Sequence, residues 1–155
     1  RNITVINDMI ADSAGNVYTT GYFIKKTGTK KFFATKANEK GVQQWVRFYP
    51  FHEADTSQAG THIVADDKGN VWVTGNRFNI EFSTCTTYAS RSVFCIRYNQ
   101  NGDIIYHTVA ERQEDNTGLY PSVCYDNKEN VYLTIRQEIV LSLIQKSSAL
   151  IKRAK

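Results

Sequence analysis

The segment 48–55 brings aromatic, histidine and acidic side chains together within a few positions of the chain. Aromatic rings beside polar groups bind sugars and peptides, so Tyr49, Phe51 and His52 are candidate binding residues. A metal held by His52 and Asp55 with a later histidine is a second possibility. Their spacing is unlike that of zinc sites, and no metal site is predicted. The structural alternative is that these aromatic side chains pack between neighbouring units of the fold.

Four lysines surround the tripeptide Thr27-Gly28-Thr29, which is typical of a hairpin turn. A tip with this much positive charge could contact a phosphate group or an acidic partner. The alternative is a solvated edge whose charges prevent pairing with other sheets. The candidate binding residues at this tip are Lys25, Lys26, Lys30 and Lys31.

The common catalytic motifs are missing from the sequence. It contains no Ser-His-Asp order, no His-Glu-x-x-His motif and no glycine-rich phosphate loop. We therefore assign no catalytic residue and expect no cofactor.

The composition indicates one ordinary globular domain. The chain has 155 residues, of which 41% are hydrophobic and 22% are charged, which is enough for a buried core. No apolar run reaches the roughly 18 residues of a membrane-spanning helix, so no membrane-spanning segment is predicted. The net charge of +4 comes from basic residues within 146–155, and such a local cluster predicts no nucleic-acid partner.

A repeated motif organises the sequence. The pattern Asp-x-x-Gly-Asn-Val-Tyr-x-Thr begins at Asp12, recurs at Asp66 with Trp in place of Tyr, and returns at Asp126 with Glu in place of Gly. A second pattern begins at Lys36 and recurs without gaps at Arg97. Asp and Asn open tight turns, and Gly supplies the positive φ that such turns need. Each pattern therefore predicts a β-hairpin.

Two hairpins in each repeat predict four consecutive antiparallel strands. An amphipathic helix over 136–153 is the alternative for the last part of the chain, but the phase of the repeat favours strands there. The variable segments 49–60, 78–91 and 110–120 are predicted as the loops that would contact a partner. The expected strands are 6–11, 16–24, 31–37, 42–48, 61–66, 70–77, 92–98, 103–109, 121–126, 130–136, 139–145 and 149–153.

Four short antiparallel strands that recur every 50–60 residues are typical of β-propeller blades. The motif from Asp12 to Gly21, followed by that from Lys36 to Trp45, resembles the SBBP-type repeat of bacterial β-propellers and is similar to NHL repeats. We therefore predict an all-β fold of three four-stranded blades, at 1–50, 51–112 and 113–155. The resemblance implies a protein of the cell envelope, periplasm or extracellular space.

Three blades are too few to close a ring, because known propellers have about four to eight. We expect an incomplete ring, either a segment of a larger propeller, as the start at Arg1 without Met indicates, or a subunit that pairs with other chains. The leading functional hypothesis is a non-catalytic interaction scaffold whose partner is a protein or a carbohydrate. The alternative is part of a propeller enzyme that hydrolyses or eliminates glycans. Its candidate axial residues, Asp8, His62 and Ser122, do not resemble a shared catalytic ring.

The three cysteines leave the redox compartment open. A disulfide between Cys85 and Cys95 would close a long hairpin in an oxidising compartment, and the alternative is two free thiols. Cys124 stands at the same repeat position as Ile10 and Val64, so we expect it to be buried.

Overall fold

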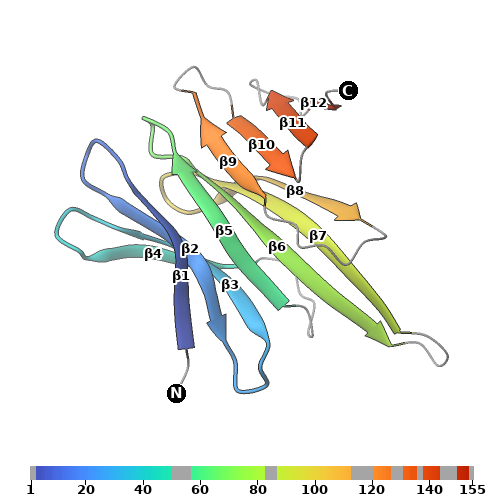
Figure 1. Cartoon of the computed structure of the whole chain (residues 1–155). Coiled ribbons are helices and arrows are strands. Elements are labelled where there is room, and N and C mark those ends of the chain that lie inside the picture. Colours follow the sequence, from blue (N-terminus) through green and yellow to red (C-terminus); the bar gives the residue numbers. More distant parts are fainter. Residues whose placement is uncertain are drawn as a thin grey trace.

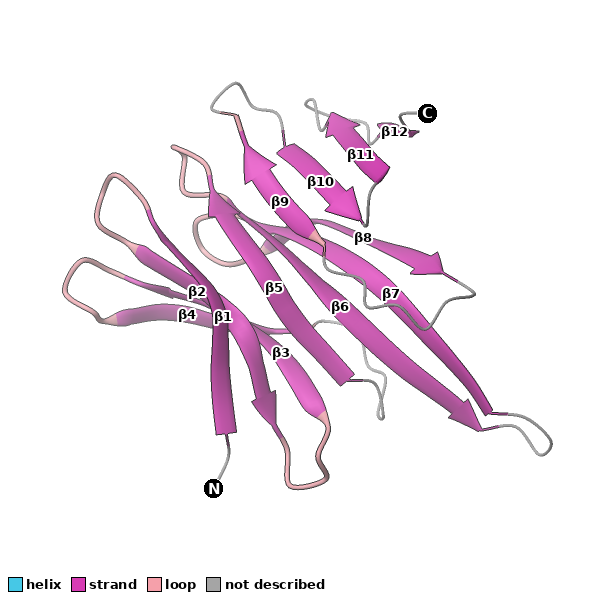
Figure 2. Cartoon of the chain, in the orientation of Figure 1, coloured by secondary structure: helices cyan, strands magenta, loops and turns pink. Residues whose placement is uncertain are grey.

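Every regular element of the chain that the structure describes is a β-strand (Figure 1; Figure 2). The structure is a computed structural model, and its described strands form three four-stranded antiparallel sheets. The predicted all-β class is therefore confirmed. The described residues are 3–49, 57–82, 87–112, 121–126, 131–135, 138–143 and 150–153.

Each sheet contains four strands that are consecutive in the chain and pair in chain order. Sheet 1 consists of β1 (Ile3–Ala11), β2 (Val17–Ile24), β3 (Lys30–Ala37) and β4 (Gln43–Phe48). Sheet 2 consists of β5 (Ser57–Ala65), β6 (Val71–Phe82), β7 (Thr87–Tyr98) and β8 (Ile104–Arg112). Sheet 3 consists of β9 (Ser122–Tyr125), β10 (Val131–Ile135), β11 (Glu138–Leu143) and β12 (Leu150–Arg153).

All twelve strands expected from the repeat are found, but several bounds differ: β5 begins at Ser57, inside the predicted loop 49–60, and β8 extends to Arg112, inside the predicted loop 110–120. The last two elements, β11 and β12, are strands, so the helical alternative for 136–153 is wrong. The segment 78–91 is mostly strand rather than loop, because β6 and β7 stay paired as far as Phe82 and Thr87. Residues added in pairs to an antiparallel hairpin form hydrogen bonds between their own backbone N–H and C=O groups. An insertion at the β6–β7 turn can therefore lengthen both strands.

The repeated aspartate of the first motif closes the β1–β2 turn. Asp12 Oδ1 accepts hydrogen bonds from the backbone N–H groups of Ala14 and Asn16, both at 2.9 Å. Asp12 Oδ2 accepts hydrogen bonds from Asn16 Nδ2 at 2.8 Å and from the Tyr18 hydroxyl at 2.9 Å. Gly15 has a φ of 80°, a conformation that residues with a Cβ rarely adopt. The residues of the motif are therefore those that form and stabilise this turn.

Acid should weaken this turn. Partial burial alone would raise the pKa of Asp12, but the hydrogen bonds from Asn16, Tyr18 and Ala14 outweigh burial and hold the pKa below its ordinary value of 3.8. The ionised group therefore stabilises the fold above pH 3.8, and this contribution disappears as the pH falls through the lower, folded-state pKa.

We expect the Asp12→Asn variant to have a flatter pH dependence of unfolding free energy in this acidic range than the unmodified chain, as measured by urea titration. Asp67→Asn, at an exposed position of the β5–β6 turn, is the matched control and should keep the original slope. An Asp12→Asn curve parallel to that of the unmodified chain would contradict the assignment.

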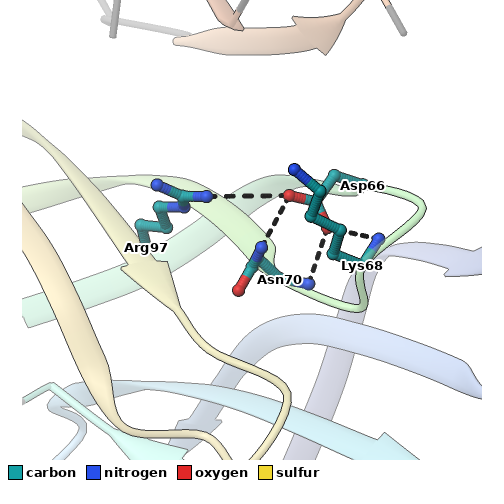
Figure 3. Close-up of polar contacts among 4 residues, drawn as sticks. All are labelled: Asp66, Lys68, Asn70 and Arg97. Atoms are coloured by element: carbon teal, nitrogen blue, oxygen red, sulfur yellow. Dashed lines mark hydrogen bonds and ion pairs between the residues drawn. The ribbon is translucent and has the colours of Figure 1, made fainter. Parts of the chain in front are cut away.

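The corresponding turn of sheet 2 uses a guanidinium where sheet 1 uses a phenol (Figure 3). Asp66 Oδ1 accepts from the backbone N–H groups of Lys68 at 3.0 Å and Asn70 at 2.8 Å, and Oδ2 accepts from Asn70 Nδ2 at 2.7 Å. Trp72 has no hydroxyl to offer. Instead Arg97 Nη2 lies 3.7 Å from Asp66 Oδ2, and the Arg97 guanidinium carbon lies 4.9 Å from the centre of the Trp72 ring. Where Trp72 replaces the tyrosine of the first repeat, Arg97 therefore supplies the contact to the aspartate that the Tyr18 hydroxyl supplies in sheet 1.

Sheets 1 and 2 each use the same repeat positions to pack against the sheet that follows. Sheets 2 and 3 meet at a buried centre made of Trp72, Cys95 and Val123. Trp72 and Cys95 occupy the repeat positions of Tyr18 and Ala34, which are buried between sheets 1 and 2. Each sheet therefore presents the same face to the sheet that follows. The buried residues between sheets 1 and 2 are Tyr18, Phe32, Ala34, Trp45, Ile63, Val71, Val73, Phe94, Ile96 and Tyr98.

Strand β4 also contacts the β7–β8 turn of the next sheet. Trp45 Nε1 donates a hydrogen bond to the Gln100 carbonyl oxygen at 3.2 Å. Arg47 donates from Nε to the Gly102 carbonyl oxygen at 2.7 Å and from Nη2 to the Asn101 carbonyl oxygen at 3.0 Å. Two side chains on alternate positions of one strand thus bind three consecutive carbonyl groups.

A β-bulge interrupts the first strand of sheets 1 and 2 at the same repeat position. In sheet 1 the pairing shifts between Ile6 and Asp8, and sheet 2 has the equivalent shift. Opposite each bulge lies the glycine of the Thr-Gly ending, Gly21 in sheet 1 and Gly75 in sheet 2. A Cβ on Gly21 would overlap the Val5 carbonyl oxygen. Close approach of the two backbones therefore explains the glycine.

Sheet 3 has an isoleucine at the position of these two glycines. Ile135 occupies the repeat position of the two glycines. Strand β9 begins at Ser122, which pairs with Thr134, so no described residue of β9 pairs with Ile135.

Candidate functional site

The first strands of the three sheets lie next to one another, with β5 between β1 and β9 (Figure 1). The bulged residue of β1, Asn7, donates from Nδ2 to the Gly60 carbonyl oxygen at 2.6 Å. The bulged residue of β5, Thr61, donates from Oγ1 to the Pro121 carbonyl oxygen at 3.0 Å. Donors at one repeat position therefore reach the next sheet in both cases, although Pro121 stands one repeat position later than Gly60.

Asp8 and His62 add a second link at the next position. Asp8 Oδ2 accepts from the backbone N–H of Ile63, and Oδ1 accepts from the N–H of Met9, both at 2.9 Å. His62 Nδ1 lies 2.7 Å from the Pro121 carbonyl oxygen, so Nδ1 carries the proton and donates it. Two of the three axial candidates, Asp8 and His62, thus join neighbouring sheets.

Sequence reasoning overlooks Asn7 and Thr61. Both are polar residues at one repeat position, directly before Asp8 and His62, and that coincidence is the signal that could have identified them. A bulge turns a side chain out of the regular alternation, and periodicity alone does not locate bulges.

Tyr49 lies between sheets 1 and 2. Its ring centre is 4.9 Å from that of Phe94, 6.4 Å from that of Phe32 and 6.0 Å from that of His107. Tyr49 also packs against the buried cluster of these two sheets. For this residue, the arrangement matches the structural alternative of packing between units.

The rest of the aromatic segment stays a prediction, because Phe51, His52 and Asp55 lie outside the described residues. The third member of the possible metal set, His62, uses Nδ1 in the link to Pro121. Among the described side chains, no three His, Cys, Asp or Glu residues gather in a way that could hold a metal ion.

The four lysines lie at the β2–β3 turn, as the sequence predicts. The N–H of Lys25 donates to the Thr29 carbonyl oxygen at 2.9 Å, and Gly28 has a φ of 85°, so the turn is tight. Lys25, Lys26 and Lys30 are exposed, and Lys31 is half-buried. The four residues Lys25, Lys26, Lys30 and Lys31 are called the lysine tip below.

The lysine tip borders the first strand of sheet 2. Lys30 Nζ lies 4.4 Å from the centre of the Tyr22 ring, and the Lys30 N–H donates to Ser57 Oγ at 3.3 Å. Because the strands are antiparallel, β2 and β4 end at the same side of sheet 1, and β6 ends at the corresponding side of sheet 2, opposite the repeated Asp and Asn turns (Figure 1). The lysine tip is thus at the end where the two sheets differ in sequence and length.

Two cysteines, Cys95 and Cys124, lie within the described residues. Cys95 is a free, buried thiol in the middle of β7, opposite Thr74. Seven residues of paired strand separate it from Thr87, the first residue of β7. Cys85 lies outside the described residues, so the possible bridge between Cys85 and Cys95 stays a hypothesis.

Cys124 is exposed, so the expectation that it is buried is wrong. Ile10 and Val64, at the same repeat position, pack against the clusters that each sheet forms with the next. Within the described residues no sheet follows sheet 3, so nothing equivalent covers Cys124.

Iodoacetamide should distinguish these two thiols. Burial raises the pKa of the Cys95 thiol to about 12, so almost none of the reactive thiolate forms at neutral pH. We expect native protein to be alkylated at Cys124, and at Cys95 only after unfolding in urea, with peptide mass spectrometry as the readout. Rapid labelling of Cys95 in the native protein would contradict its burial.

No helix capable of crossing a membrane is found in the described part of the chain. Comparison of the sequence with models of known protein families and with curated proteins gives no significant match.

Proposed function

We propose that this chain is a non-catalytic interaction scaffold whose sheets are blades of a β-propeller, similar to the SBBP-type repeat. The observation that carries the proposal is that Asn7 and Thr61, which share one repeat position, each donate to a backbone carbonyl of the next repeat, Gly60 and Pro121 respectively. Equivalent sheets that stack with the same face forward, around adjacent first strands, are typical of blades around an axis.

The number of sheets supports a role in a larger assembly. Known propellers have about four to eight blades, and three sheets leave an open arc. The SBBP resemblance favours a place in the cell envelope or outside the cell, with the remainder of a propeller or another protein as partner. Carbohydrate is the second class of ligand that we consider.

The use of Asp8 and His62 favours a scaffold over the propeller enzyme. Both oxygens of Asp8 accept backbone hydrogen bonds, one of them across the sheet interface. His62 is likewise engaged by the Pro121 carbonyl. A general acid or base must instead reach a substrate atom. The contacts of these residues therefore favour a structural role.

The lysine tip is the surface that we propose for an acidic partner. Clustered like charges attract a complementary surface and raise the association rate, more strongly at low salt. Lys25 and Lys26 stand exposed at the turn, where they do not contribute to the described core.

Charge reversal tests this surface. The tagged chain, expressed in its source cells, should recover a partner from the envelope or secreted fraction after cross-linking. We expect Lys25→Glu with Lys26→Glu to abolish that recovery, and Lys68→Glu, at an exposed lysine in the β5–β6 turn at the opposite end, to preserve it. Equal recovery by both variants would exclude the lysine tip, and recovery from the cytosolic fraction alone would exclude the proposed location.

A glycan hydrolase and lyase screen tests the non-catalytic assignment. We expect no turnover by the unmodified chain. Asp8→Asn should instead lower the free energy of unfolding by about 2 kcal/mol, because a charge-assisted hydrogen bond between sheets is weakened. Turnover that disappears in Asp8→Asn or His62→Ala would establish the enzyme alternative.

A further inference from the structure

The face of sheet 1 turned away from sheet 2 carries exposed apolar side chains. Met9 is 64% exposed and Phe48 is 55% exposed. The Phe48 ring packs edge-on against Phe23, with ring centres 5.7 Å apart. Thr19 and Thr35, on neighbouring strands of this face, bond their hydroxyl groups to each other at 2.7 Å. We call this surface, with Met9, Thr19, Thr35 and Phe48, the outer face of sheet 1.

The equivalent face of sheet 2 is covered. Ile63, at the repeat position of Met9, is 2% exposed. Val109, at the position of Phe48, packs against the cluster between sheets 1 and 2. The same repeat position is therefore buried when another sheet precedes it and exposed when none does.

The β3–β4 turn shows the same contrast with the β7–β8 turn. Gly102 is buried, and a Cβ there would lie 2.9 Å from Trp45 Cδ2 and 3.0 Å from Arg47 Cζ. Gly41, its repeat equivalent, is exposed and has no neighbour within 4 Å of the same point. The carbonyl groups of Glu39 and Gly41 thus correspond to the two that Trp45 and Arg47 bind in the next sheet.

From this correspondence we propose that the outer face of sheet 1 is the docking surface for a further four-stranded sheet of the same repeat. The incoming sheet would carry an indole at the Trp45 position and a guanidinium two residues later, donating to the carbonyl groups of residues 39–41. Between sheets 1 and 2, Asp8 accepts a hydrogen bond from the N–H of Ile63, the equivalent of Met9. The N–H of Met9 already donates to Asp8 Oδ1, so the incoming sheet needs no acidic residue to accept from it. This inference rests on the proposed scaffold function and specifies one of its partners.

A second copy of this chain fits the surface less well. The chain has two tryptophans, and both are buried: Trp45 between sheets 1 and 2, and Trp72 between sheets 2 and 3. Sheet 3 is the sheet that a second copy would present in head-to-tail stacking, and its fourth strand, β12, is the four-residue segment Leu150–Arg153. That strand supplies no indole for the turn carbonyls.

A tandem chain tests the docking surface. Residues 1–54 are duplicated ahead of Arg1, which keeps the 54-residue spacing between Asp12 and Asp66. The duplicate carries Met9→Leu, so the Met9 of the full chain remains the only methionine and its oxidation by hydrogen peroxide can be followed by mass spectrometry. We expect hydrogen peroxide to oxidise Met9 rapidly in the 155-residue chain, where it is exposed, and slowly in the tandem chain.

Controls in the duplicate separate docking from mere attachment. Trp45→Ala with Arg47→Ala in the duplicate should restore rapid oxidation of Met9, whereas Gln44→Ala, at an exposed position of the same strand, should not. Unchanged oxidation in the tandem chain would overturn the proposal. So would a dimer of the 155-residue chain in which Met9 is protected, because a second copy would then be the occupant.

Phe48→Lys provides a measurement that does not depend on the oxidation assay. The substitution is made in the full chain and not in the duplicate. Because Phe48 is exposed, we expect the urea midpoint of the 155-residue chain to change little. In the tandem chain Phe48 would be covered by the duplicate, so we expect the midpoint to fall. If Phe48→Lys shifted the urea midpoint equally in both chains, the proposal would be overturned. An unfolded duplicate would give this same result and would count against the proposal too. Partner recovery and the glycan screen use other surfaces, so this test can fail while the scaffold assignment stands.

Discussion

Trp45→Ala should destabilise the protein by about 3–5 kcal/mol, the usual range when a large aromatic side chain is removed from a core. Trp45 is only 6% exposed, and its ring centre lies 6.3 Å from that of Tyr18 and 5.7 Å from that of Tyr98. Its removal would also leave the Gln100 carbonyl without the indole donor. Urea unfolding followed by circular dichroism measures the loss.

Val42→Ala is the matched control for this substitution. Val42 is exposed and directly precedes the strand that contains Trp45, so its truncation should change the free energy of unfolding by no more than about 0.5 kcal/mol. If Trp45→Ala and Val42→Ala had similar effects, the contact between β4 and the β7–β8 turn would not hold sheets 1 and 2 together.

Gly75→Ala should cost about 3 kcal/mol, although it adds only a methyl group. A Cβ at this position would overlap Phe94 Cζ and the Ala59 carbonyl oxygen. A ring could move aside, but the Ala59 carbonyl belongs to the bulged strand β5 and its displacement disturbs the pairing with β6. Overpacking of this kind typically costs about 1–3 kcal/mol and more when backbone must move. Thermal and urea unfolding both report the change.

Gly28→Ala separates crowding from backbone strain. Gly28 has a φ of 85° but open space around its Cβ position, so alanine there meets strain without a clash. We expect a smaller loss of roughly 1 kcal/mol. A Gly75→Ala protein as stable as Gly28→Ala would mean that β5 and β6 can separate at the bulge without cost.

The local structure follows from short-range chemistry and could be predicted. Asp12, Gly15 and Asn16 satisfy one another within a single turn, so their spacing identifies the turn wherever it recurs. The Thr-Gly ending is also visible in the sequence, but its reason is not. Only the bulge opposite Gly75 explains why a side chain has no room there.

The candidate site was predicted less well, because it depends on contacts between sheets. The sequence directs attention to Tyr49 and to possible axial acids, whereas the structure places Tyr49 in the core and uses Asp8 as a link. Asn7, Thr61 and Arg47 make the other links, and each reaches a backbone carbonyl that carries no side-chain signature.

By itself the sequence determined the twelve strands, their order within each sheet and the chemistry of the turns, because these depend on residues close together in the chain. Tertiary structure alone decided which face of each sheet is covered. Met9 and Ile63 are equivalent apolar residues on equivalent strands, yet one is exposed and the other buried. The difference between them lies in whether a neighbouring sheet is present, and a pattern of single residues does not contain that information.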